Sequence, residues 1–463
     1  MRGILGHAGY VPFWRLDRST VAAVAGTGGG KGSRAVASYD EDTTTMAVEA
    51  ARIARSGEAC PRLAALYFST TAPTYVDKTN ATAIHAALQL DGDVVAADFG
   101  GAPRSAIAAL RLAVTAEEPA LLVAADIRTG LPGSADESSG GDGASALLVG
   151  TDADGPVLAE FLGSGSASEE FLDRWRTPGD SRSKQWEERF GEGRYTALAD
   201  DAWSGALKAA ELTPGDVSHL IVTGPHLRAA AAAGRRLAAT TEGAVIVDDL
   251  SGGVGQTGAA HPGLLLSATL DTAPVGSTIA LVSLADGADV LVFRVRALRP
   301  SARPVSDQVA AGTALPYGKF LSWRGMLTVD PPRRPEPARV SASAAARNTA
   351  WKFGFVASRT SDSGRVNLPP SVPGAAGDAE PMAMADVRGT VATYTVDRLA
   401  YSPSPPVVFA VVDFDGGGRL PLELTDCDAT SVAIGDRVEL TFRRLSSADG
   451  IANYFWKARP VRA

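Results

Sequence analysis

The chain has 463 residues, of which 45% are hydrophobic and 21% are charged. That length exceeds a single ordinary domain of roughly 100–200 residues, so we expect two or three hydrophobic cores. Its 44 basic and 52 acidic residues give a net charge of −8, which argues against a nucleic-acid partner or an anionic membrane surface. No apolar run approaches the roughly 20 residues of a membrane span, so we expect no membrane insertion.

The amino-terminal segment predicts a cytoplasmic protein. Glycine, histidine and proline interrupt residues 1–18 where a secretory signal would need an unbroken apolar run. Cys60 and Cys427 are the two cysteines, too few for a disulfide framework or a four-cysteine zinc site. We expect both to be buried packing residues.

Residues 1–296 alternate apolar, strand-like runs with alanine-rich helical stretches, which is typical of a layered α/β domain. The strand-like runs fall into two similar batches, at 63–70, 93–100, 119–126 and 144–150, and at 219–224, 244–249, 278–285 and 290–298. A polar insertion at 164–200 separates the batches. The pattern predicts a duplicated α/β core with a cap or lid segment.

Composition changes after residue 296. Residues 297–350 are rich in proline, arginine and serine, which predicts an extended linker. Residues 351–463 contain alternating strands joined by glycine turns such as Asp415–Gly418 and Ile434–Asp436. We expect a small antiparallel β-barrel of the OB type there.

Four stretches, at 39–54, 71–84, 125–150 and 255–289, carry a family resemblance. They resemble the 3-hydroxy-3-methylglutaryl-CoA synthase and ketoacyl synthase III branch of the thiolase superfamily, in the same order along the chain. The resemblance implies a duplicated α-β-α-β-α fold, a homodimer and a pantetheine tunnel. It also implies an acyl-CoA or acyl-carrier thioester as substrate, so that coenzyme A or phosphopantetheine is the substrate carrier and no cofactor is bound.

The carboxyl-terminal part is similar to the OB-fold domain that accompanies thiolase-like acyl-CoA enzymes. In that family a zinc ribbon with paired cysteines usually precedes the barrel. Here Thr360 and Ser363 stand where the first pair would align, and no cysteine follows near Pro373. The resemblance therefore implies an OB-fold domain at 351–463 with a degenerate, metal-free ribbon.

The nucleophilic cysteine of the family aligns with Asp98. A carboxylate is a poor acyl acceptor from a thioester, because the mixed anhydride it would form lies uphill. Asp98 could instead act as a general base or hydrogen-bonding group. The structural alternative is that it only caps the helix that follows it.

Two histidines and an amide are the other candidates for acid–base or oxyanion work. Pro225-His226 resembles the Pro-His pair that binds the thioester oxygen in ketoacyl synthase III, against the alternative of an ordinary loop histidine. Gln256 replaces the asparagine of the family's Gly-Asn-Thr segment and keeps an amide donor. His261 follows it by about one turn and is a further candidate for the site.

The glutamate that acts as general acid in the synthases is missing. The aligned residues are Ser69, Thr70 and Thr71, so Thr70 is the candidate at that position. Tyr75 is a possible replacement proton donor, although a tyrosine there is more often a packing residue. Loss of both the cysteine and the glutamate argues against a working hydroxymethylglutaryl-CoA synthase.

Three functions remain open from the sequence. The first is a cysteine-independent lyase or synthase of the aldol type that acts on an acyl thioester. The second is an acyltransferase or condensing enzyme with an atypical site, and the third is a non-catalytic thiolase-like scaffold subunit. Convergence of Asp98, His226, Gln256 and His261 on one pocket would favour the enzymes.

Overall fold

The computed structural model describes residues 1–463 except 27–28, 58–59, 181, 372–378 and 463. The chain forms two compact units. The first comprises Met1–Ala37, Ala50–Ala81 and Gly92–Tyr317, and the second comprises Ser38–Glu49, Thr82–Asp91 and Gly318–Ala463. Within the described part of the chain, no helix has both the length and the apolar character needed to cross a membrane.

A ten-stranded mixed sheet forms the first unit, in the order β12-β11-β13-β14-β8-β1-β7-β6-β4-β5. The strands are β1 (Arg2–Tyr10), β4 (Ala65–Thr70), β5 (Val95–Gly100), β6 (Ala120–Asp126), β7 (Gly143–Thr151), β8 (Ala159–Ala167), β11 (His219–Thr223), β12 (Val245–Ile246), β13 (Thr278–Leu284) and β14 (Ala288–Val295). A smaller sheet combines β15 (Thr313–Ala314), β2 (Trp14–Asp17) and β3 (Ser33–Val36).

The large sheet consists of two halves with the same topology. In the first half, β4 runs parallel to β5 and β6, and β7 pairs antiparallel with both β6 and β1. In the second half, β11 runs parallel to β12 and β13, and β14 pairs antiparallel with both β13 and β8. The predicted duplicated thiolase-type core is confirmed.

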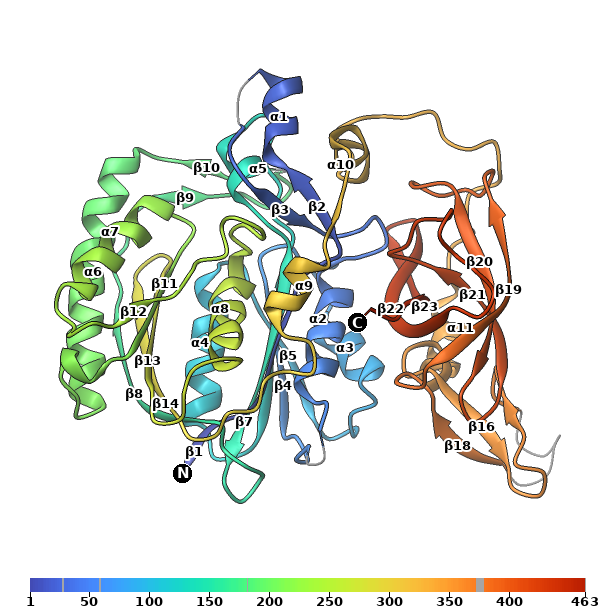
Figure 1. Ribbon diagram of the computed structural model, residues 1–463, viewed down its shortest axis with the longest axis horizontal. Helices are drawn as coiled ribbons and strands as arrows, with labels where there is room; N and C mark the ends of the chain where they lie inside the picture. Colours follow the sequence, from blue (N-terminus) through green and yellow to red (C-terminus); the bar gives the residue numbers. More distant parts are fainter. Residues whose placement is uncertain (27–28, 58–59, 181, 372–378, 463) are drawn as a thin grey trace. The chain divides into compact units, whose positions relative to one another are not determined.

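Two helices pack between the halves. Helix α4 (Arg104–Thr115) contacts β4, β6 and β13, and α8 (His261–Leu270) contacts β1, β7, β11 and β13. Figure 1 shows both helices between the strands of the two halves. Nine of the ten residues of α8 are buried, which explains why its sequence is apolar all round.

The polar insertion at 164–200 serves two purposes. Its second part begins helix α6 (Glu188–Ala209), which packs on β8 and β14 through a buried face that includes Tyr195 and Trp203. Its first part forms the ribbon β9 (Arg174–Trp175) and β10 (Lys184–Gln185). The remaining helices of this unit include α1 (Arg18–Ala25), α5 (Ala135–Ser139), α7 (Leu227–Ala238) and α9 (Val305–Ala310), with the 3-10 turns η1 (Pro214–Asp216) and η2 (Gly258–Ala260).

A closed five-stranded barrel dominates the second unit and confirms the predicted OB-type domain. Its order is β19-β20-β21-β23-β22, with β19 (Gly389–Asp397), β20 (Val407–Phe414), β21 (Arg419–Leu424), β22 (Arg437–Ala448) and β23 (Ile451–Pro460). A separate sheet of β17 (Val366–Asn367), β16 (Val356–Thr360) and β18 (Ala379–Ala383) stands where the ribbon is predicted. Pro373 lies outside the described residues.

The predicted linker contains short helices. Besides α9, residues 297–350 include α10 (Tyr317–Trp323) and α11 (Ala342–Arg347), and α12 (Thr349–Lys352) follows. Val305 and Phe320 are buried, so this stretch is not extended throughout. The helices α2 (Thr43–Ala54) and α3 (Ala81–Ala87) complete the chain. The exact domain limits given by the sequence remain a prediction.

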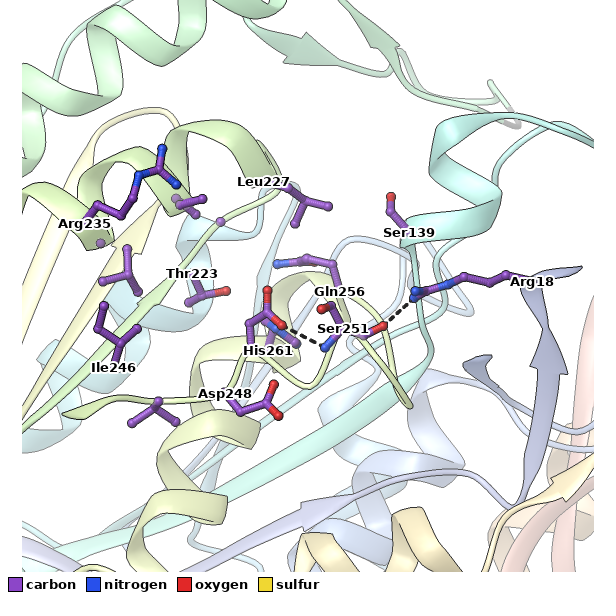
Figure 2. A pocket seen from close by; sticks show the side chains of 17 residues that line it. Arg18, Ser139, Thr223, Leu227, Arg235, Ile246, Asp248, Ser251, Gln256 and His261 are labelled. Carbon is purple, nitrogen blue, oxygen red and sulfur yellow. Dashed lines mark hydrogen bonds between the residues drawn. The ribbon is translucent and has the colours of Figure 1, made fainter. Parts of the chain in front are cut away.

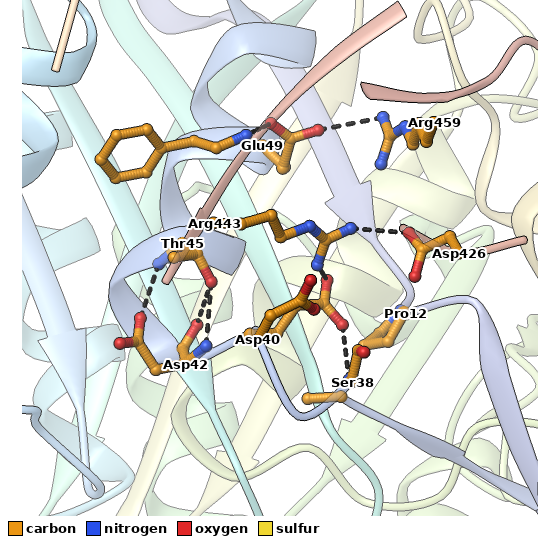
Figure 3. A network of polar contacts seen from close by, with 12 residues as sticks. Pro12, Ser38, Asp40, Asp42, Thr45, Glu49, Asp426, Arg443 and Arg459 are labelled. Atoms are coloured by element: carbon orange, nitrogen blue, oxygen red, sulfur yellow. Dashed lines mark hydrogen bonds and ion pairs between the residues drawn. The ribbon is translucent and has the colours of Figure 1, made fainter. Parts of the chain in front are cut away.

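Acidic residues of the segment Ser38–Glu49 pair with basic residues of the barrel inside the second unit (Figure 3). Arg443 of β22 forms ion pairs with Glu41 and, at 2.6 Å, with Asp426. On β23, Lys457 lies 3.0 Å from Asp40, and Arg459 Nη2 lies 2.9 Å from a carboxylate oxygen of Glu49. These side chains are at most 5% exposed, and mutual pairing is what makes burial of such charges tolerable.

Asp40 should make the stability of the second unit sensitive to acid. Burial alone would raise the pKa of Asp40, but Lys457 and Arg443 outweigh burial and hold that pKa at about 2. Because the ordinary aspartate pKa is about 3.9, this stabilisation is complete above that value and is lost as the pH falls toward 2. We expect a loss of about 2 kcal/mol across this window, measured by urea unfolding at each pH. An Asp40→Asn variant should lack this component, and an unchanged acid profile in that variant would contradict the assignment.

Both cysteines differ from the prediction of buried packing residues. Cys60 is exposed and Cys427 is partly exposed. Cys60 follows the end of α2, where its sulfur accepts a hydrogen bond from the side chain of Arg55. Burial, together with Asp426, raises the pKa of the Cys427 thiol to about 12, so this thiol stays protonated and unreactive at neutral pH.

Candidate functional site

Among the described residues of the first unit, a pocket lies on either side of the turn that follows β11. The larger one, about 620 Å³, is named here the Asp173 pocket; its walls come from the ends of β4 and β5 and from the β9 ribbon. The smaller one, about 470 Å³, is named the His261 pocket and lies between α7, the 246–251 loop and His261 (Figure 2). Gly224 lines the His261 pocket and the next residue, Pro225, lines the Asp173 pocket.

The predicted site residues do not all converge. Thr70, Tyr75 and Asp98 line the Asp173 pocket, whereas Gln256 and His261 line the His261 pocket. His226 is among the lining residues of neither pocket, although its neighbours line both. The structure therefore divides the candidates into two groups.

Asp98 caps a helix, but not the one that follows it. Its carboxylate accepts hydrogen bonds from the backbone N–H of Asn80 at 2.7 Å, the Asn80 amide at 3.0 Å and the backbone N–H of Ala81 at 2.8 Å. These donors belong to the start of α3, which precedes Asp98 in the sequence. The expectation that Asp98 caps the following helix is wrong, because β5 continues to Gly100 and α4 begins only at Arg104.

Removal of this cap should affect stability more than chemistry. We expect Asp98→Ala to lower the free energy of unfolding by about 1 kcal/mol, the usual value of an amino-terminal cap. Urea denaturation measures this loss, and Asp98→Asn should recover part of it because the amide oxygen still accepts a hydrogen bond. An unchanged stability in Asp98→Ala would contradict the capping role.

His226 also serves as a cap. Its Nδ1 accepts a hydrogen bond from the backbone N–H of Ala229 at 3.1 Å, and its Nε2 lies 2.8 Å from the Glu188 carbonyl oxygen. The ring is buried at the start of α7. Both ring nitrogens are thus engaged by backbone groups, which leaves neither for the thioester oxygen that the resemblance assigns to His226.

Gln256 and His261 lie near each other in the His261 pocket (Figure 2). His261 Nδ1 accepts from the backbone N–H of Thr257 at 3.3 Å, and burial lowers the pKa of His261 to about 4, so the ring is neutral at pH 7. The Gln256 side-chain oxygen accepts from the Gly258 N–H at 2.6 Å, which leaves its NH₂ group as the donor available to a ligand. Gly255, at φ +86°, permits this turn, since a Cβ there would lie 2.5 Å from the Gly140 carbonyl oxygen.

Asp126, at the end of β6, links the two halves of the first unit beside Thr70. Its carboxylate accepts from the Thr70 hydroxyl at 3.0 Å, from the backbone N–H of Thr71 at 2.7 Å and from that of Ala259 at 2.8 Å. Burial raises the pKa of Asp126, although Arg128 and these donors oppose the change. Asp126 was not among the residues predicted from the sequence. The feature that could have marked it is a single acidic residue at the end of an otherwise apolar strand.

Asp173 is the second residue that the sequence analysis missed. Its side chain is 2% exposed, and its Oδ1 has no hydrogen-bond partner among the described residues. Burial raises the pKa of Asp173. Two neighbours only partly oppose that rise: His226, whose Nε2 lies 4.0 Å from Oδ1, and the Tyr195 hydroxyl. The residue lies in the polar insertion, where no motif marks it, and only folding brings α6 and α7 against it.

Tyr195 and Asp286 extend this cluster along the pocket wall. The Tyr195 hydroxyl accepts from the backbone N–H of Asp286 at 3.3 Å, and burial beside Asp173 raises the pKa of Tyr195. Burial likewise raises the pKa of Asp286. Perturbed acids that line one cleft are typical of acid–base sites. Within the described ranges, no cluster of three or more His, Cys, Asp or Glu side chains is placed to hold a metal ion.

Comparisons with known proteins agree with this architecture. Over 337 residues, the chain is 29% identical to a hydroxymethylglutaryl-CoA synthase of Thermococcus sibiricus, which corresponds to 70% of this chain and 96% of the relative. Residues 381–443 match the family model described as the carboxyl-terminal OB-fold domain of ChsH2. The chain belongs to the thiolase superfamily. It joins a domain of the hydroxymethylglutaryl-CoA synthase and FabH type to a ChsH2-type OB-fold domain.

Solved structures show the same thiolase-like fold. A crystal structure of an HMG-CoA synthase complexed with CoA matches with a TM-score of 0.59 and 18% identity, over 69% of this chain and 89% of that one. The 3-oxoacyl-(acyl carrier protein) synthase III, FabH, from Pseudomonas aeruginosa matches with a TM-score of 0.54 and 20% identity, over 65% and 99% of the two chains. These structures share the fold of this chain, and the distant homology to hydroxymethylglutaryl-CoA synthases rests on the sequence relatives.

Proposed function

We propose that this thiolase-like protein makes or breaks a carbon–carbon bond next to an acyl thioester, by an aldol or retro-aldol reaction without an acyl-enzyme. The observation that carries the proposal is the Asp173 carboxylate, which is buried, lines a pocket and has an Oδ1 with no hydrogen-bond partner among the described residues. A general base needs a raised pKa and a free oxygen at the reacting group. Asp173 has both.

The residues at the position of the family's nucleophile support a reaction without a covalent intermediate. The sequence alignment predicts Asp98 at that position, and its oxygens already accept three hydrogen bonds from the start of α3. The Thr70 hydroxyl nearby donates to the Asp126 carboxylate, whose oxygens also accept from the backbone N–H groups of Thr71 and Ala259. Covalent catalysis requires an activated nucleophile, whereas aldol chemistry requires only a base and support for the enolate oxygen.

The His261 pocket fits the carrier arm of the thioester. It runs from Arg18 and Arg235 to Gln256 and His261, so that cations at its edge would meet phosphates and the Gln256 amide would donate to the thioester oxygen. A homologous fold has been solved with CoA. Because Gly224 and Pro225 line the two pockets in turn, we propose that the acyl group passes this turn and enters the Asp173 pocket.

In the cleavage direction the electrons balance without a further reactant. Asp173 removes the proton of the β-hydroxyl, the oxygen forms a carbonyl, and the Cα–Cβ bond breaks. Its electron pair moves into the thioester enolate, which the Gln256 amide stabilises. The enolate then recovers the proton from Asp173 at Cα, so a ketone or aldehyde and a shorter acyl thioester are released.

The test is a panel of β-hydroxyacyl-CoAs, short and polycyclic, incubated with the pure protein and analysed by mass spectrometry. We expect a shorter acyl-CoA together with a ketone or aldehyde from at least one member, and loss of both products in Asp173→Asn. A longer thioester formed from two acyl-CoAs would indicate a condensing enzyme instead. Products that persist in Asp173→Asn would contradict the role of Asp173.

A non-catalytic scaffold is the second candidate, and one observation favours it. Asp98 and His226 both cap helices through their side chains, and the four candidate residues of the sequence do not meet in one pocket. A scaffold would give no product with any member of the panel. It would instead change the activity of a partner enzyme that is purified with it.

A further inference from the structure

Helix α6 has a glycine at the point where it passes the Asp173 carboxylate. A Cβ atom on Gly191 would lie 2.5 Å from Asp173 Oδ1 and 2.9 Å from His226 Cδ2, and both distances are shorter than a van der Waals contact. Gly191 lies inside the helix, where glycine is less favourable than alanine because it loses more backbone freedom. The property that this position uses is therefore the missing side chain and not the flexibility of the backbone.

Hydrogen bonds hold the segments around Gly191 together. The backbone N–H of Trp186, which lies between β10 and α6, donates to the Asp173 carbonyl oxygen at 2.8 Å. On the other side, His226 Nε2 lies 2.8 Å from the Glu188 carbonyl oxygen, and backbone groups engage both of its ring nitrogens. The backbone of Asp173 and the ring of His226 are thus both fixed against the first turns of α6.

The Asp173 carboxylate occupies the space that the missing side chain leaves. Its side chain is 2% exposed, and Oδ1 has no hydrogen-bond partner among the described residues. Asp173 also lines a pocket, which is open space next to the carboxylate. Because the His226 ring is held in place, a methyl group on Gly191 would displace the carboxylate from the helix toward this pocket, where water reaches it.

Building on the proposed function, we propose that Gly191 is a positioning residue for the base Asp173, because the bare surface of α6 lets the carboxylate lie against the helix and away from solvent. Removal from solvent disfavours the charged form and makes the carboxylate a stronger base. The titratable groups that face this carboxylate are His226 on α7, Tyr195 on α6, Arg174 beside it and Asp286 after β13. A substitution at Gly191 removes none of these groups, so its effect reports the position of the carboxylate.

The test compares Gly191→Ala with Gly193→Ala, a matched change in the same helix at a position where a Cβ would meet no atom within 4 Å. The substrate is a β-hydroxyacyl-CoA that the unaltered protein cleaves. Gly191→Ala should lower kcat at least about tenfold and leave KM within about twofold, because a misplacement of roughly 1 Å at a reacting group can cost about 100-fold. Gly193→Ala should leave both constants unchanged.

The pH profile separates positioning of the base from a general loss of structure. In Gly191→Ala the acidic limb of kcat/KM should move to lower pH, because a carboxylate that is more exposed to water has a pKa closer to its ordinary value. A lower kcat with the acidic limb in its original place would overturn the positioning role. An unchanged kcat in Gly191→Ala would overturn it as well.

A double-mutant cycle tests the packing without an assay of activity. Gly191→Ala should lower the urea midpoint of unfolding, whereas the same change in an Asp173→Ala background, which lacks the carboxylate, should not lower it. If Gly191→Ala alone does not fold, a folded double variant gives the same answer. Equal losses in the two backgrounds, or a double variant that also fails to fold, would overturn the inference. If the unaltered protein cleaves no member of the panel, the proposed function fails, while the cycle still decides whether Gly191 makes room for Asp173.

Discussion

Replacement of Arg443 by methionine is expected to lower the free energy of unfolding by about 3–5 kcal/mol, the usual result of removing one partner from a buried ion pair. The guanidinium group is fully buried and pairs with Glu41 and Asp426, which are themselves 0% and 1% exposed. Methionine would leave both carboxylates without their cation in an interior of low polarity. Urea unfolding, followed by the fluorescence of the buried Trp456, measures the change.

Arg419→Met is the matched control, since Arg419 pairs with Asp413 on the barrel surface with 64% and 45% of the two side chains exposed. Solvent screens an exposed pair, so that it contributes little to stability, and this variant should unfold almost like the parent protein. The double variant Glu41→Leu with Arg443→Met should regain part of the stability, because one uncompensated charge disappears. Similar losses in the Arg443 and Arg419 variants would contradict the buried network.

The second large effect is expected at Asp173. If this residue is the base, Asp173→Asn should lower kcat/KM by about 10²–10⁴-fold, the usual contribution of a positioned general base. Asparagine keeps the size of the side chain, so the loss would reflect proton transfer and not packing. Asp180→Asn is the control, because Asp180 lines the same pocket but accepts a hydrogen bond from Thr177, and it should retain activity.

The pH profile separates catalysis by Asp173 from a structural role. Burial raises the pKa of Asp173, so the base is protonated and inactive below a pKa that lies above the ordinary value of about 3.9. We expect kcat/KM to fall as the pH is lowered through that raised pKa, and the acidic limb to disappear from the residual activity of Asp173→Asn. If kcat/KM of the Asp173→Asn variant still fell at the same acidic pH, the group that titrates there would not be Asp173.

Local patterns were sufficient for the elements of the fold. Strands such as β6 and β13 are buried on both faces and therefore require continuous apolar runs. Such runs can be recognised in the sequence without knowing which strands pair with them. Their repetition in two batches predicted the duplication, and the alternating strands after residue 380 predicted the barrel. The family motifs also predict that Asp98 and Gln256 stand at the positions of the usual cysteine and asparagine, and this alignment remains a prediction.

The environment of each side chain depended on the packing of distant segments. Asp98 caps α3 and not the next helix, because Asp98 lies within β5 and α4 begins only at Arg104. The composition of the linker predicted an extended chain. In the structure, however, Val305 and Phe320 are buried and lie in the short helices α9 and α10. The composition of a segment indicates its overall polarity, but it does not predict which individual apolar residues pack into a hydrophobic core.

By itself, the sequence determined the class of the two units and the duplicated topology, since both depend on local periodicity. The alignment of Asp98 with the family's catalytic cysteine remains a prediction from a motif. Only the tertiary structure decided that Asp173 meets His226, that Gly191 faces both of them, and that the acidic segment 38–49 pairs with the barrel about 400 residues later. The reason is physical: burial and pairing change what a side chain can do, and both depend on neighbours that are remote in the chain.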